Sequence, residues 1–90
     1  MSPQYGQDTI GIHFTWKPDQ EAVERALVAV EAALTPFGAR PHWGKLFLAD
    51  AASIAPLYER LPDFAHLVER LDPRGAFRND WLEQHVLGGV

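Results

Sequence analysis

The first clear pattern along the chain is an alternation of apolar and polar residues over positions 8–16, DTIGIHFTW. Successive side chains of an extended chain point to opposite faces, so this alternation predicts a β-strand with one apolar face. The apolar face carries Ile10, Ile12, Phe14 and Trp16. The opposite face carries Thr9, Gly11, His13 and Thr15.

A helical pattern follows directly. Asp19 is a good N-cap residue, and the helix that it begins is predicted to run to about Leu34. Pro36 and Gly38 then end it. Helical spacing gathers the apolar residues Val23, Ala26, Leu27, Val30 and Leu34. The solvent side is predicted to carry Glu21, Glu24, Arg25 and Glu31.

Residues 39–48 have the character of a second strand, which gives the order strand, helix, strand. The helix is expected to cover the apolar face of the first strand. The predicted fold class is therefore α+β: a βαβ-type unit, with two strands flanking a long helix, followed by three short helices.

The three short helices have local start signals. Asp50 or Ser53 caps the first, Asp63 starts the second after Pro62, and the third runs from Asn79 to about Val86. DPRG at 72–75 has type I turn chemistry. The predicted buried positions of the first helix are Ile54, Leu57, Tyr58 and Leu61. Those of the second are Phe64, Leu67, Val68 and Leu71.

Two strands alone do not make a stable sheet, because each leaves a row of backbone groups without partners. The pattern therefore indicates a piece of a larger sheet. We expect it to be completed either by the remainder of a longer protein or by a partner. For the isolated fragment, the open edges favour a homodimer.

Composition narrows the function. The chain has 90 residues, a net charge of −4 and no cluster of Lys and Arg, which argues against nucleic-acid binding. It has no cysteine, hence no disulfide or thiolate metal site. No apolar run is long enough to span a bilayer, and the start MSPQYGQD lacks the features of a signal peptide. A cytoplasmic protein is expected.

Two stretches carry candidate chemistry. His13 and Thr15 lie two apart on one strand face, so their side chains point the same way about 7 Å apart. In RPHWGKLF, residues 40–47, a bulge at Gly44 would let His42 and Lys45 converge. The alternative interpretations are structural: a polar strand face that meets water, and a lysine whose stem passes apolar neighbours to reach solvent.

Other kinds of site have little support. The four histidines, His13, His42, His66 and His85, have no metal-ligand spacing, so no metal site is predicted. Ser53 stands where a helix cap belongs rather than in a triad, and there is no glycine-rich phosphate loop.

Three blocks of sequence carry a family resemblance: DTIGIHFTWKPD, ALTPFGARPHWGKLF and RLDPRGAFRNDWLEQHVLG. They resemble the C-terminal part of the alditol (xylitol) oxidases, which belong with the sugar-lactone oxidases of the D-arabinono-1,4-lactone oxidase type in the vanillyl-alcohol oxidase superfamily. HFTW together with PHWGK is fairly specific. LDPRGAFRN has a wider distribution among such flavoenzymes.

The resemblance implies an FAD-dependent oxidoreductase that oxidises a sugar alcohol or an aldonolactone, with O₂ as the acceptor giving H₂O₂. It also implies that these residues are a fragment of a cap domain with a large antiparallel sheet. The FAD-binding domain would lie N-terminal to these residues, and the fragment alone would be inactive. By motif, His13 and Thr15 bind the polyol, Lys45 contacts the hydroxyl being oxidised, and His42 lies near the flavin. A rival interpretation is a stand-alone α+β dimerisation module without catalysis.

Overall fold

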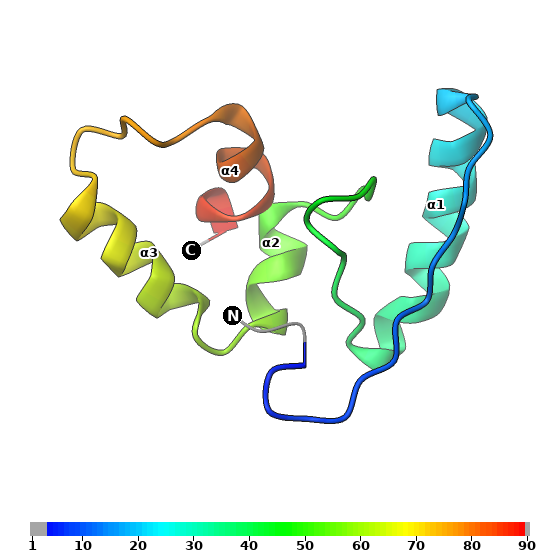
Figure 1. The fold of residues 1–90 in the computed structure, drawn as a ribbon, viewed down its shortest axis with the longest axis horizontal. Coiled ribbons are helices and arrows are strands. Elements are labelled where there is room, and N and C mark those ends of the chain that lie inside the picture. Colours follow the sequence, from blue (N-terminus) through cyan, green and yellow to red (C-terminus); the bar gives the residue numbers. More distant parts are fainter. Residues whose placement is uncertain (1–3, 90) are drawn as a thin grey trace.

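A computed structural model of the chain describes residues 4–89, and these residues form helices joined by loops (Figure 1). The α-helices are α1 (Gln20–Leu34), α2 (Ala51–Ile54), α3 (Leu61–Leu71) and α4 (Asp80–His85). The short 3₁₀ helices are η1 (Thr35–Phe37), η2 (Ala55–Leu57) and η3 (Leu87–Gly89). No β-strand occurs within the described range, so the predicted α+β class with two flanking strands was wrong.

The second predicted strand fails because other acceptors take its backbone donors. The Gly44 N–H donates to the His42 ring and the Lys45 N–H to the His42 carbonyl, which makes a tight turn. The Leu48 and Ala49 N–H groups donate to the carboxylate of Glu31. Side-chain acceptors of this kind compete with ladder hydrogen bonds, so residues 39–48 form a loop.

The first predicted strand is extended but has no ladder beside it (Figure 1). Its apolar side chains are not covered by α1 as expected, because Ile10 is 86% exposed and Trp16 is 37% exposed. The rings of Phe14 and Trp16 stack on each other at 5.3 Å between centroids. Alternation makes a chain extended, but a strand also needs a neighbour with which to exchange hydrogen bonds.

One predicted helix start was wrong. Helix α3 begins at Leu61, before Pro62, and not at Asp63. Proline fits the first turn of a helix because its missing N–H would have no partner there, so Pro62 does not mark a break.

The limits predicted for α1 and α4 from local signals are confirmed. The Asp19 carboxylate accepts from the Ala22 N–H at the start of α1. Gly38 follows η1 in the left-handed region with φ of 64°, which glycine adopts without a steric penalty. Asn79 caps α4 by accepting from the Leu82 N–H.

Asp50, one of the two residues considered, caps α2. Its carboxylate accepts from both the N–H and the hydroxyl of Ser53, and these bonds hold the pKa of Asp50 below its usual value. The DPRG turn closes with the Gly75 N–H donating to the Asp72 carbonyl. The Asp72 carboxylate continues the turn by accepting from two further N–H groups, those of Ala76 and Phe77.

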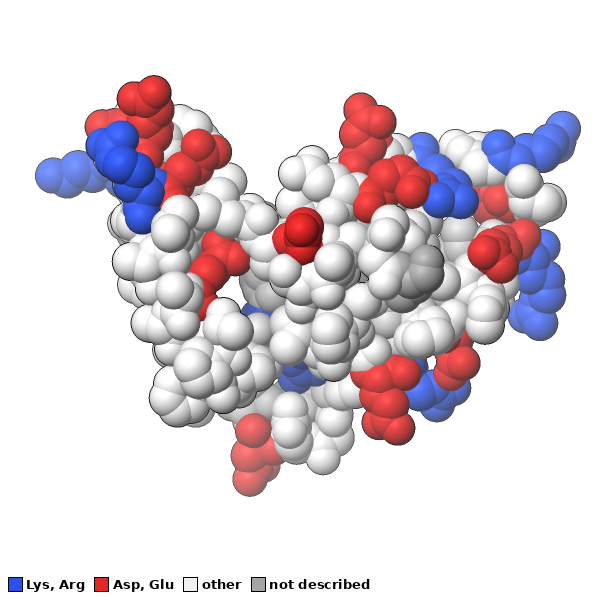
Figure 2. All heavy atoms as spheres, turned by 180° about the vertical axis from the view of Figure 1, so that it is seen from behind, with Lys and Arg blue, Asp and Glu red and all other residues white. Residues whose placement is uncertain are grey.

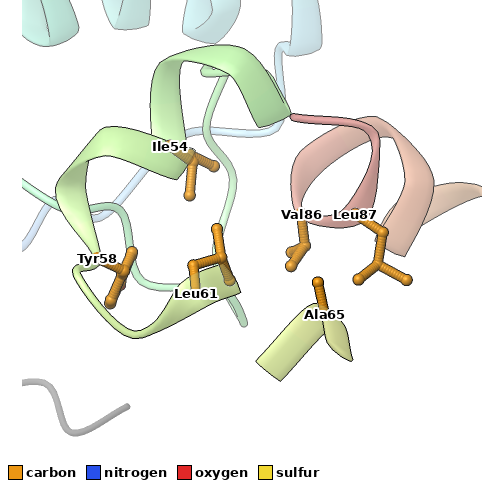
Figure 3. Packing of buried hydrophobic residues seen from close by; sticks show 6 residues of the cluster. All are labelled: Ile54, Tyr58, Leu61, Ala65, Val86 and Leu87. Carbon is orange, nitrogen blue, oxygen red and sulfur yellow. The ribbon is translucent and has the colours of Figure 1, made fainter. Parts of the chain in front are cut away.

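The core lies where α2, α3 and α4 meet (Figure 3). Its buried side chains are Ile54, Tyr58, Leu61, Ala65, Val86 and Leu87. Phe64 and Val68 of α3 pack against this core as predicted, but Leu67 and Leu71 stay 41% and 71% exposed. The buried stripe of α3 is thus narrower than its apolar stripe.

The chain is flat and has a large surface. Its extents are 40 × 30 × 18 Å and its radius of gyration is 14.5 Å, where a compact 90-residue domain has about 12 Å. Its accessible surface is 6978 Å², against about 5,300 Å² for a compact protein of this mass. In Figure 2 the charged side chains stand mostly around the edge, and the middle of that face is largely uncharged. Within residues 4–89, no helix is both long and apolar enough to cross a membrane.

Leu61→Ala should destabilise the chain by about 2–5 kcal/mol, because Leu61 is fully buried and truncation leaves a cavity. Leu71→Ala makes the same chemical change on the same helix at a position that is 71% exposed, so it should cost far less. Urea unfolding followed by circular dichroism measures both. Equal effects of the two substitutions would contradict the position of the core.

Candidate functional site

The predicted site residues His42 and Lys45 are the two ends of one tight turn. The Lys45 N–H donates to the His42 carbonyl at 3.0 Å, and the Gly44 N–H donates to His42 Nδ1 at 3.0 Å. Because Nδ1 accepts this bond, the proton of the neutral ring lies on Nε2. The expected convergence at Gly44 thus takes the form of a turn, with no strand bulge.

Gly44 brings its backbone close to the ring of His42. A Cβ atom built there would lie 3.1 Å from Cε1 of His42, so the imidazole would have to move by a few tenths of an ångström to admit a side chain. The close approach foreseen at this glycine is made by the ring of His42. Gly11, whose missing side chain was expected to leave room, has no heavy atom within 4 Å of a built Cβ.

Aromatic contacts hold the two flanks of the turn. The ring of Trp43 lies 5.9 Å from that of Tyr58 and 5.7 Å from that of Trp81. The ring of Phe47 lies 6.2 Å from Trp81 and 4.8 Å from His85. Both Trp43 and Phe47 pack against the buried core, so the turn is tied to α2–α4.

Lys45 and His42 themselves are exposed. Within residues 4–89 the ammonium of Lys45 makes no hydrogen bond or ion pair. The loop that carries the turn lies between α1 and α2 in Figure 1. The turn thus presents a cation and an imidazole at the surface, while Trp43 between them and Phe47 after them pack against the core.

His13 and Thr15 lie on the extended segment that precedes α1, and both are exposed. No hydrogen bond or ion pair of residues 4–89 joins either of them to His42 or Lys45. The four predicted site residues therefore occupy two separate segments. Of the four, His42 and Lys45 share one turn, and His13 and Thr15 share the extended segment.

The backbone just after the turn is held by two side chains that the sequence did not single out for a site. The Glu31 carboxylate accepts from the Leu48 and Ala49 N–H groups at 2.7 and 2.9 Å. His85 is buried, and its Nδ1 lies 2.9 Å from the Ala49 carbonyl oxygen. Since a carbonyl can only accept, Nδ1 of His85 is the protonated nitrogen.

Arg40, just before the turn, lies beside two tyrosine rings that contact each other. Its guanidinium carbon is 5.4 Å from the centroid of Tyr5 and 5.2 Å from that of Tyr58, within the range of cation–π attraction. Burial raises the pKa of the Tyr58 hydroxyl above its usual value, and the charge of Arg40 partly opposes this shift. The Tyr5 hydroxyl accepts from the Arg60 N–H at 2.6 Å.

The hollows of the surface lie elsewhere. One of about 440 Å³ is lined by α1 and Leu48, and another of about 440 Å³ lies beside α3, with His66, Glu69 and Arg78 in its lining. Neither is lined by His13, Thr15, His42 or Lys45. Among residues 4–89, no three histidine or acidic side chains gather as a metal site would require.

Comparison with known proteins identifies the family. The sequence profile of the D-arabinono-1,4-lactone oxidase family matches residues 1–85. The chain belongs to this family. It is 46% identical over 88 residues to an alditol oxidase of Streptomyces sp., covering 98% of this chain and 21% of the relative.

Other members of the D-arabinono-1,4-lactone oxidase family are similar over the same extent. An L-gulono-1,4-lactone dehydrogenase of Mycobacterium tuberculosis is 37% identical over 90 residues, covering 98% of this chain and 20% of the relative. An L-gulonolactone oxidase of Mus musculus is 30% identical over 87 residues, covering 93% and 20%. The chain thus spans about a fifth of the length of these curated relatives. The resemblance inferred from the three sequence blocks is confirmed.

One sequence signal could have indicated a role for Glu31, which was instead predicted to face solvent. Glu31 lies in the last turn of α1, where the helix dipole disfavours a negative charge. An acidic residue there indicates a compensating partner outside the helix. His85 had a weaker signal, because Trp81 four residues earlier lies on the same helix face.

The raised pKa of Tyr58 makes stability depend on pH in the alkaline range. The folded state favours the neutral phenol of Tyr58. Its contribution to the free energy of unfolding is therefore fully present below the pKa of an unfolded tyrosine, near 10, and is lost as the pH rises through the higher pKa of the folded protein. Tyr58→Phe should remove that loss. Ultraviolet titration of both proteins, with the variant subtracted, isolates Tyr58. An ordinary tyrosine midpoint in the difference would contradict its burial.

Proposed function

We propose that these 90 residues are the C-terminal, substrate-domain part of an FAD-dependent oxidase that acts on a sugar alcohol or an aldonolactone. Family membership over nearly the whole chain supports the class of reaction. The observation that carries the proposal is the turn at 42–45, which leaves His42 and Lys45 exposed while Trp43 between them packs against the core.

The donors of this turn suit a flavin. His42 keeps Nε2–H as a donor because Nδ1 is taken by the Gly44 N–H. A flavin offers nitrogen and carbonyl acceptors at its edge, and His42 is the residue proposed to lie against them. FAD, bound mainly by an N-terminal domain outside these residues, would supply the hydride acceptor.

Lys45 is the proposed catalytic residue. When an alcohol is oxidised, its hydroxyl proton leaves and negative charge develops on the oxygen. An ammonium fixed beside that oxygen lowers the energy of the charged transition state more than that of the neutral substrate. Trp43 and Phe47, packed in the core on either side, restrict the backbone that carries this ammonium.

His13 and Thr15 are the proposed ligands of the substrate's other hydroxyls. Their side chains are exposed and make no hydrogen bond with one another or with the turn, so both are available to a polyol. Hydroxyls donate and accept, which an imidazole and a threonine hydroxyl can match. A substrate bound to these two residues and to Lys45 would bridge the two segments.

Lys45 is exposed in these residues, so the enclosure that its role requires would come from the N-terminal FAD domain. It follows that the isolated 90-residue chain would be inactive. Its large surface and exposed apolar side chains favour a homodimer of the fragment. Completing the proposal, the enzyme is cytoplasmic and uses O₂, which takes up the two electrons and two protons as H₂O₂.

In the full-length enzyme, Lys45→Met should slow bleaching of the flavin absorbance by a sugar alcohol about a hundred- to thousandfold with little loss of substrate affinity. Methionine keeps the apolar bulk and removes the charge. Thr15→Val is the contrasting change, since it removes a ligand of ground state and transition state alike and should mainly raise the Michaelis constant. Stopped-flow absorbance measures both. A Lys45 variant as fast as the parent would return Lys45 to a surface role.

The isolated chain should stay colourless after incubation with FAD and desalting, and it should sediment as a dimer at high concentration. Both follow from the absence of enclosure around the turn and from the exposed apolar segment 8–16. Retained flavin at one-to-one stoichiometry would contradict the fragment role. If the full-length gene product also lacked flavin absorbance, the non-catalytic dimerisation module would replace the oxidase.

A further inference from the structure

The backbone of Leu48 and Ala49 is hydrogen-bonded by two side chains that are far away in sequence. Glu31 accepts both N–H groups, one on each carboxylate oxygen, at 2.7 and 2.9 Å. His85 takes the opposite polarity and donates to the Ala49 carbonyl at 2.9 Å. Three backbone polar groups in two adjacent residues are thus fixed by α1 and α4 together.

The Glu31 contact is strong because the acceptor is ionised. Hydrogen bonds to a charged carboxylate are shorter and roughly twice as strong as neutral ones. Its two oxygens meet two successive N–H groups, so the bond fixes direction as well as distance. The unfavourable place of a carboxylate in the last turn of α1 indicates that this helix position serves the contact.

His85 is fixed in turn by its own packing. Its ring lies 4.8 Å from that of Phe47 and 5.2 Å from that of Trp81, and the residue is 8% exposed. Phe47 is therefore held through its ring, and Ala49 through its carbonyl, by the same imidazole. The segment that leaves the turn can shift only if α4 shifts with it.

We propose that Glu31 and His85 are positioning residues for Lys45. This inference rests on the proposed catalytic role of Lys45. Lys45 lies three residues before Leu48, so its Cα is at most about 10 Å from the Glu31 contact along an extended chain. A short peptide held at Trp43 on one side and at residues 47–49 on the other places the lysine stem between two fixed points.

Weakening these contacts should lower the rate of flavin reduction because the ammonium of Lys45 is then placed less accurately. A misplacement of about 1 Å of a catalytic group can cost on the order of a hundredfold in rate. Glu31→Gln is the sharpest change because it preserves size and shape. The amide oxygen can still accept one N–H, but its NH₂ group faces the other N–H and donor meets donor.

The test uses the full-length flavoenzyme. Glu31→Gln should slow flavin bleaching by sugar alcohol roughly tenfold to a hundredfold, with unchanged flavin content. Glu24→Gln is the matched control, because it makes the same change on the same helix. Among residues 4–89, the Glu24 carboxylate accepts only from the exposed side chain of Gln20. This control should leave the rate near that of the parent. A Glu31 variant as fast as the control would overturn the inference.

Combining Glu31→Gln with Lys45→Met separates positioning from general damage. If Glu31 acts through Lys45, the Glu31→Gln change should not slow flavin reduction further once the ammonium is gone. The rate losses of the two single variants will then not multiply in the double variant. Multiplied effects would overturn the inference while leaving the role of Lys45 intact. A Lys45 variant at parental rate would instead remove the proposed function, and the inference with it.

A second pair of variants covers the case in which Glu31→Gln does not fold. His85→Asn keeps an N–H donor near the place of Nδ1, whereas His85→Leu keeps apolar bulk and loses the donor. In the protein that keeps Lys45, flavin reduction should be faster in the asparagine variant than in the leucine variant. In the Lys45→Met protein, the two variants should reduce the flavin at equal rates. Equal rates for the two variants in the Lys45 protein would overturn the inference.

Discussion

The arrangement of the chain depends on two hydrogen bonds, which the Leu48 and Ala49 N–H groups donate to the Glu31 carboxylate. They tie the last turn of α1 to the residues that lead directly into α2. They also use the donors that a strand would offer to its neighbour, so they account for the loop where a strand was predicted. One carboxylate thereby decides both the place of α1 and the conformation of the segment behind the candidate site.

How far the fold could be predicted follows from the range of each signal. The caps at Asp19 and Asn79 and the DPRG turn each depend on a hydrogen bond between residues three positions apart. All were predicted correctly because the residues that define each one are neighbours in sequence. A strand is defined by a neighbour at any distance in sequence, so alternation over residues 8–16 could predict an extended segment but not its pairing.

The same limit applies to the candidate site. Gly44 signalled a break in regular structure, and the turn it permits does unite His42 with Lys45. The partners that hold the following backbone are 17, 18 and 36 residues away, from Glu31 to Leu48 and Ala49 and from His85 to Ala49, and pattern alone does not join such positions. Glu31 was assigned to solvent because helical periodicity marks it polar without revealing what it contacts.

Exposure links the packing of the chain to its proposed chemistry. Ile10, Ile12 and Lys45 are all exposed. The accessible surface of the chain is about 1,700 Å² larger than that of a compact protein of its mass. Two unit charges 4 Å apart attract by about 1 kcal/mol in water and by about 4 kcal/mol at the effective dielectric of about 20 that describes protein sites, buried ones included. An ammonium in water therefore does little for a developing alkoxide. Covering Lys45 with another domain would raise its electrostatic effect, and covering the apolar segment would gain burial energy, so stability and catalysis favour the same enclosure.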